Sequence, residues 1–70
     1  MTPEWFKKQI EAIKDKQSTK TYVELLETAN KTLKQLEIPG GTYKPPLSPE
    51  TQARYIEEVT KIKEFLEKQI

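Results

Sequence analysis

The chain has 70 residues, fewer than the roughly 100–150 of a typical domain, so residues 1–70 can form one small domain. It contains neither Cys nor His, which excludes disulfides, a tetrahedral zinc site and every catalytic triad built on histidine. The 12 basic and 11 acidic residues give a net charge of +1, so no overall field attracts nucleic acid or an anionic membrane.

The first residues are polar and contain no apolar run of the kind that a secretory signal needs. No stretch of the sequence approaches the roughly 20 apolar residues of a membrane span. We therefore expect a cytoplasmic protein that does not associate with a membrane. A short apolar stripe beside lysines near the N-terminus resembles an interfacial anchor, but its shortness and the small net charge favour a role in the core.

The first predicted helix covers residues 3–16. Thr2 can cap it, and Pro3 suits its first turn because the missing N–H has no partner there. Its apolar residues repeat at helical spacing, with Trp5 at the edge of the stripe: Phe6, Ile10 and Ile13.

The second predicted helix covers residues 19–37. Its apolar stripe and that of the first helix would lie on nearly opposite faces of one continuous helix, so we place a break near residues 17–19, with Ser18 or Thr19 as the cap. Val23 and Leu25 widen the second stripe on both sides. The stripe alternates spacings of four and three residues, as in a bundle or short coiled coil: Tyr22, Leu26, Ala29, Leu33 and Leu36.

A loop rich in proline and glycine should follow, because Pro39 disfavours the helical conformation of the residue before it. We expect Tyr43 and Leu47 to fasten this loop to the helices. The third predicted helix covers residues 49–69 and begins with Ser48 and a proline, like the first. Its stripe comprises Tyr55, Val59, Ile62 and Leu66, and Phe65 lies off it. Three helices with one apolar stripe each predict an all-α, small three-helix bundle.

The sequence does not favour catalysis. The paired glutamates on the second and third helices alternate with lysines three or four residues away, which is typical of a solvated helix face. A bundle of this size is also not expected to form a ligand pocket of about 300 Å³ beside its core. We expect no enzyme, no cofactor, no metal and no small-molecule substrate.

Large apolar side chains at the edges of the stripes favour an interaction with another protein. The candidate partner-binding residues are Trp5, Val23, Leu25 and Phe65. The chain would act as a regulator or inhibitor, by docking on a partner or by forming a homodimer through the second helix. A monomer that uses all of these side chains in its core is the alternative within this class.

A small nucleic-acid-binding regulator is the alternative from another class. Arginine occurs once in the chain, and Glu24 and Glu27 on the second helix would repel phosphate, both of which disfavour it. The candidate nucleic-acid-binding residues are Lys7, Lys8, Lys14, Lys20, Lys31 and Lys34.

Overall fold

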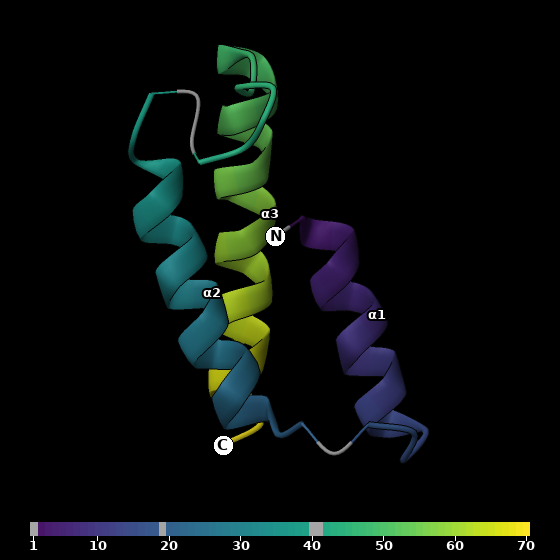
Figure 1. Ribbon diagram of the computed structural model, residues 1–70. Coiled ribbons are helices and arrows are strands. Elements are labelled where there is room, and N and C mark those ends of the chain that lie inside the picture. The colour runs from purple at the N-terminus through teal and green to yellow at the C-terminus, as the bar shows by residue number, and fades with distance from the viewer. Residues whose placement is uncertain (1, 19, 40–41) are drawn as a thin grey trace.

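The computed structural model describes residues 2–18, 20–39 and 42–70, which form three α-helices and, within these ranges, no strand. The helices are α1 (Pro3–Lys14), α2 (Tyr22–Leu36) and α3 (Pro49–Lys68) (Figure 1). The all-α three-helix fold predicted from the sequence is confirmed. Each helix is shorter at one or both ends than predicted, and the local hydrogen bonds explain where each one begins and ends.

All three helices begin with a hydroxyl cap. The side chains of Thr2, Thr21 and Ser48 each accept a hydrogen bond, at 3.2 Å, from the backbone N–H three residues ahead. Such a bond satisfies one of the N–H groups that the first turn leaves unpaired. The predicted caps of α1 and α3 are therefore confirmed.

The start of α2 differs from the prediction. The helix begins at Tyr22 rather than residue 19, and its cap is Thr21. Ser18 instead accepts a hydrogen bond at 3.2 Å from the backbone N–H of Lys20, which makes a local turn rather than a helix start. The other predicted cap, Thr19, lies outside the described residues.

The end of α1 also differs, because the helix ends at Lys14 rather than residue 16. Lys16 has a φ of 59°, in the left-handed region that usually holds glycine. The N–H of Lys16 donates to the carbonyl of Ile13 (3.1 Å), and the N–H of Gln17 donates to that of Ala12 (2.8 Å). This pair of bonds is a Schellman motif, which closes the helix and turns the chain toward α2.

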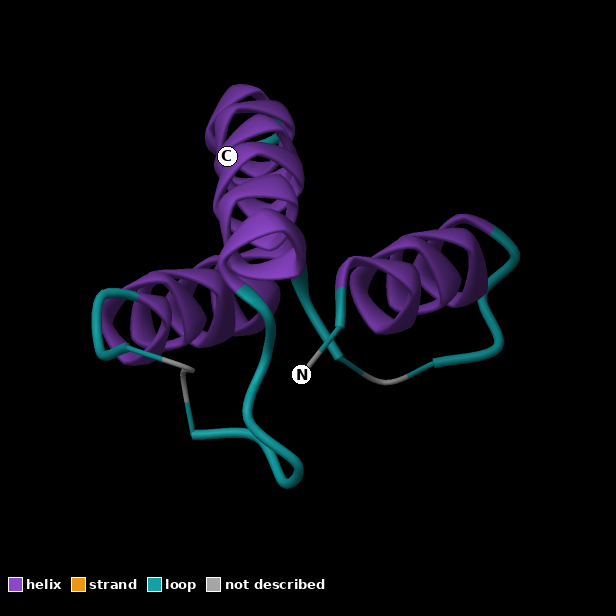
Figure 2. Cartoon of the chain, turned by 90° about the horizontal axis from the view of Figure 1, so that it is seen from above, coloured by secondary structure: helices purple, strands orange, loops and turns teal. Residues whose placement is uncertain are grey.

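α2 and α3 form an antiparallel pair, and α1 runs in the same direction as α3 along the half of it near the C-terminus (Figure 1). Seen from above, α3 lies between the other two helices (Figure 2). α2 and α3 contact each other more extensively than either contacts α1. The core contains residues from all three helices: Phe6, Ile10, Leu25, Ala29, Leu36, Val59, Ile62 and Leu66.

The buried face of α2 is rotated relative to the predicted stripe. Leu25 and Thr32 are buried, whereas Tyr22, Leu26 and Leu33 are only partly buried beside the core. The hydroxyl of Thr32 donates to the carbonyl of Thr28 at 2.9 Å, so this buried polar group is satisfied within the helix. All residues of the predicted apolar stripe do contact the core. The line of most deeply buried residues, however, lies closer to Leu25 than the periodicity predicted.

The loop between α2 and α3 is fastened as predicted. Tyr43 and Leu47 are partly buried against the core, and the rings of Tyr43 and Tyr55 meet edge to face with centroids 5.9 Å apart. Burial, followed by the neighbouring Tyr55, raises the pKa of Tyr43 above its usual value. The side-chain amide of Gln52 donates to the carbonyls of Leu36 and Ile38, which the end of α2 leaves without helical partners.

Candidate functional site

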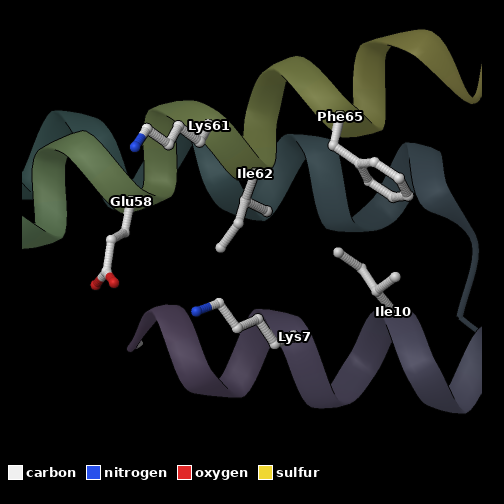
Figure 3. Close-up of a pocket in the computed structure, with 6 residues that line it drawn as sticks. All are labelled: Lys7, Ile10, Glu58, Lys61, Ile62 and Phe65. Carbon is white, nitrogen blue, oxygen red and sulfur yellow. The ribbon is translucent and has the colours of Figure 1, made fainter.

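A groove runs between α1 and α3 on the surface of the bundle. Its main part has a volume of about 330 Å³, and Figure 3 shows the six residues that line it. A neighbouring hollow of about 300 Å³ shares Lys7, Ile10 and Phe65 with the main part. We call the two together the α1–α3 groove. It is lined by Lys7, Ile10, Glu11 and Lys14 of α1 and by Glu58, Lys61, Ile62 and Phe65 of α3.

Both helices contribute to the groove with the same spacing. On each of them the lining residues stand at positions i, i+3, i+4 and i+7, which is one face over two helical turns. The expectation that so small a bundle forms no pocket of about 300 Å³ is therefore wrong. α1 has fewer contacts with the α2–α3 pair than its members have with each other, and the space beside α3 stays open to solvent.

The floor of the groove is apolar and fixed in place by the core. Ile10 of α1 and Ile62 of α3 point into the space between the two helices, Ile10 opposite Phe65 and Ile62 opposite Lys7 (Figure 3), and they are 9% and 7% exposed. Phe65 is half-buried and meets the ring of Tyr22 edge to face, with centroids 6.4 Å apart and an angle of 76° between the planes. This contact with α2 orients the Phe65 ring, which is the largest apolar side chain of the groove.

Charged side chains surround the apolar floor. At one end Lys7 and Glu58 point toward each other from opposite helices (Figure 3). On the α3 side, the ammonium of Lys61 is 3.3 Å from the Glu57 carboxylate, and both side chains are about 70% exposed. On the α1 side, the ammonium of Lys14 lies 5.3 Å from the centroid of the Phe65 ring. The rim therefore presents three ammonium groups and two carboxylates, Glu11 and Glu58, around an apolar centre.

The four residues predicted to bind a partner do not lie together on one helix face. Phe65 forms a wall of the groove, and Val23 of α2 is 48% exposed. Trp5 is half-buried, with its ring edge to face with Phe6 (centroids 5.0 Å apart) and the Lys20 ammonium 5.0 Å from its own centroid. Leu25 is fully buried. In this fold Leu25 stabilises the core and has no surface to offer a partner.

The predicted homodimer through the second helix rested on the apolar stripe of that helix. In the structure this stripe packs against α3 and α1, with Leu25, Ala29 and Leu36 fully buried. Residues on the opposite side of α2, such as Glu27, Asn30 and Lys34, are exposed and polar. The homodimer through the second helix stays a prediction, for which Val23 and the exposed edges of Leu26 and Leu33 are the apolar surface that α2 retains.

The six lysines proposed for nucleic-acid binding point in several directions. Lys7 and Lys14 line the groove, whereas Lys20 covers the ring of Trp5. Lys8 is exposed, and it follows the buried Phe6 by two positions, which turns it to the far side of α1. Lys31 and Lys34 are exposed on α2, each two positions from the buried Ala29 or Thr32, on the face away from the core. This placement does not form one continuous basic stripe.

Sequence reasoning missed the groove because Ile10 and Ile62 were both assigned to the core. They do belong to it, but their edges also form the floor of an open surface. The only signal in the sequence was Phe65, which lies off the apolar stripe of its helix. The spacing of apolar residues within one helix gives no information about the distance between two helices. The groove, which depends on that distance, therefore could not be predicted from the sequence.

Among the described residues, no group of three or more acidic side chains is placed to hold a metal ion. The Glu57 carboxylate is paired with Lys61, whereas the Glu58 side chain lines the groove. The two neighbouring acids therefore lie in different environments. None of the helices in the described ranges has the length and apolar character that crossing a bilayer requires.

Comparisons with protein-family models, with curated proteins and with solved structures returned no match. The fold and the groove are therefore the basis for any functional conclusion.

Proposed function

We propose that the chain is a non-enzymatic protein–protein interaction module, a regulator or inhibitor, whose α1–α3 groove receives an amphipathic helix of a partner protein. The observation that carries this proposal is the matched spacing of the groove's lining residues. Two helices that each present i, i+3, i+4 and i+7 positions to one open apolar floor form a seat for a third helix. An occupant in that seat would complete a four-helix arrangement beside α3.

The dimensions of the groove support a short docking segment and a modest affinity. Two turns of lining on each side correspond to roughly 10 Å along the helix axis. An occupant of two to three turns buries less surface than the roughly 1,200 Å² at which stable complexes begin, which is typical of transient binding. We therefore expect dissociation constants of about 10–100 µM for a single helix.

The first experiment selects helical peptides on the purified chain and then locates where they bind. The probe is a display library of amphipathic helices of about 20 residues, long enough to be helical alone, with varied residues at positions i, i+3, i+4 and i+7. Binders are titrated into the isotopically labelled chain, and the methyl signals of Ile10 and Ile62 are followed by NMR. The proposal predicts the largest shifts at these methyls and at the Phe65 ring.

A matched pair of variants controls this experiment. Phe65→Ala removes a wall of the groove, and we expect it to weaken peptide binding about tenfold. Val23→Ala removes an exposed apolar side chain outside the groove and should leave binding unchanged. Circular dichroism confirms that both variants remain helical. Failure to enrich any binder, or shifts confined to the outer face of α2, would refute the proposal.

A second copy of the chain is the competing occupant. Light scattering over a hundredfold range of concentration distinguishes it from a partner protein, with the methyl signals of the groove recorded over the same range. We expect a constant monomer mass and unchanged signals. A dimer whose formation shifts the Ile10 and Ile62 methyls would show that the groove serves self-association instead.

A further inference from the structure

The turn that follows α1 carries an inference that goes beyond the proposed function. We infer that residues 15–18 are a hinge through which two copies of the chain exchange α1. In the exchanged form, α1 of each copy packs on the α2–α3 pair of the other, which gives a symmetric domain-swapped dimer. The partner is thus a second copy of this chain, and the element that it contributes is its own α1.

Lys16 adopts a conformation that its side chain disfavours. Its φ of 59° brings the Cβ atom close to the following carbonyl oxygen, and glycine, which avoids this contact, is absent from residues 15–18. The sequence predicts instead that the helix continues to residue 16, and lysine and glutamine are good helix formers. α1 nevertheless ends at Lys14, since the chain turns back there toward α2. Local preference and fold therefore disagree at the hinge.

Opening the hinge resolves this disagreement without leaving backbone groups unpaired. The N–H groups of Lys16 and Gln17 close the turn by donating to the carbonyls of Ile13 and Ala12, respectively. If α1 instead continues through residue 17, the same N–H groups donate to the carbonyls four residues back, which are those of Ala12 and Ile13. Lys16 then returns to the right-handed helical region. Short hinges under strain favour exchange between copies for this reason.

α1 is also the helix that is most easily released from the bundle. It has less contact with α2 and α3 than these two have with each other. The side chains of residues 15–17 are exposed, so the hinge makes no part of the core. The Lys20 ammonium lies 5.0 Å from the centroid of the Trp5 ring and favours the closed form, but an exposed cation–π contact of this kind is weak.

The face that α1 leaves is complementary to α1 of another copy. Release of α1 exposes the apolar side chains of α2 and α3 that form one core with Phe6 and Ile10 in the closed chain. An α1 from a second copy carries the same side chains and restores the same contacts, so the two forms differ mainly at the hinge. The exchange is reciprocal, which closes the dimer about a twofold axis and leaves no face for a third copy.

The closed monomer predominates at low concentration. The segment that joins α1 to α2, residues 15–21, keeps a released α1 near its own α2–α3 pair, at an effective concentration in roughly the millimolar range. In the micromolar range the chain therefore stays a monomer, in agreement with the constant mass expected above. The swapped dimer surrounds Ile10 and Ile62 as the closed chain does, so it leaves their methyl signals in place, unlike a dimer formed through the groove.

Light scattering and NMR on a mixture of labelled and unlabelled chain test the exchange. Equal amounts of methyl-labelled and unlabelled chain are mixed at about 1 mM in total, warmed to just below Tm and cooled slowly. We expect a dimer in which the labelled Ile10 methyl shows a nuclear Overhauser effect to the Phe65 ring of an unlabelled copy, because these two side chains lie opposite each other in the groove (Figure 3). The dimer should dissociate on dilution to about 10 µM.

Lys16→Gly and Lys16→Ala are a matched pair of variants, since both remove the same charge. Glycine accepts the left-handed conformation of the closed turn, so it should weaken the dimer about tenfold at each hinge and about a hundredfold in all. Alanine keeps the Cβ atom and favours a helix, so its dimer should be at least as stable as that of the unsubstituted chain. Circular dichroism verifies that both variants keep the fold.

Each outcome of these experiments supports or refutes the exchange. A chain that stays monomeric at about 1 mM after warming would refute it. A dimer without the effect between Ile10 and Phe65 of different copies would be joined through another surface, such as the exposed edge of α2, and would refute it as well. If Lys16→Gly and Lys16→Ala dimerise equally, the conformation of Lys16 does not drive the exchange, and the inference fails. None of these outcomes depends on whether the groove binds a helix of another protein.

Discussion

Replacing Lys16 with glycine is expected to stabilise the protein, although it removes a whole side chain. Lys16 has a φ of 59° and occupies the position after the cap of α1 where the Schellman motif turns left-handed. A residue with a Cβ atom pays about 1–2 kcal/mol in that conformation, because the Cβ approaches the following carbonyl oxygen. Glycine avoids this contact.

The gain is reduced by the unfolded state, in which glycine has more conformational freedom. That entropy costs about 0.4–1 kcal/mol on folding, so the net stabilisation should be about 0.5–1 kcal/mol. For a domain of this size, 1 kcal/mol shifts the midpoint of thermal unfolding by about 4–8 °C. Lys16→Gly should thus raise Tm by about 2–8 °C.

Thermal and urea unfolding followed by circular dichroism measure the effect. Lys16→Ala keeps a Cβ atom and should leave Tm nearly unchanged, which separates backbone conformation from loss of the lysine charge. Lys8→Gly places glycine inside the exposed face of α1 and should destabilise by about 1 kcal/mol, the opposite sign. If Lys16→Gly lowers Tm, or if Lys16→Ala raises it as much as glycine does, the left-handed conformation does not limit the stability of this turn.

Three further experiments test the fold. Leu25→Ala should cost about 2–5 kcal/mol, most of the stability of so small a domain, and abolish the cooperative urea transition, whereas the exposed Val23→Ala should change it by less than about 0.5 kcal/mol. Thr21→Ala should cost about 1 kcal/mol of unfolding free energy and Ser18→Ala clearly less, because only Thr21 caps α2; equal costs would contradict this assignment. The raised pKa of Tyr43 means that the fold favours the neutral phenol, so stability should be complete below the unfolded pKa of 10.0 and should fall as pH rises through the folded value. The midpoints of urea unfolding, measured between pH 8 and 11, should fall less for Tyr43→Phe than for the unmodified chain. An equal fall in both proteins would show that the Tyr43 phenol does not cause the loss of stability at high pH.

The sequence was sufficient to predict the features that depend on neighbours along the chain. Thr2 and Ser48, each followed by proline, marked two helix starts, and Tyr43 and Leu47 were large apolar side chains close to the third helix in a loop that needed fastening. These signals act within a few residues and involve one hydrogen bond or one apolar contact. Such local preferences agree with the final fold here.

The features that the sequence did not predict depend on alternatives of similar local strength or on distances between helices. Ser18, Thr19 and Thr21 are all adequate caps, so the choice among them is made by the turn that joins α1 to α2. Lys16 carries no sign that it adopts a left-handed conformation, because glycine is the residue that normally marks it. The groove itself requires the placement of α1 beside α3, which periodicity does not determine.

The limited contact between α1 and the rest of the bundle has a consequence for how the protein opens. Only Phe6, Ile10 and Pro3 of α1 are buried, whereas α2 and α3 bury residues along most of their shared length. We therefore expect the free energy needed to expose the amides of α1 to be smaller than that of global unfolding, so that this helix opens as a cooperative unit of its own. Amide protons of α1 should exchange with solvent through a partial opening in which the α2–α3 hairpin persists. A helix bound in the groove would contact both α1 and the α2–α3 hairpin, so the two units would then unfold together.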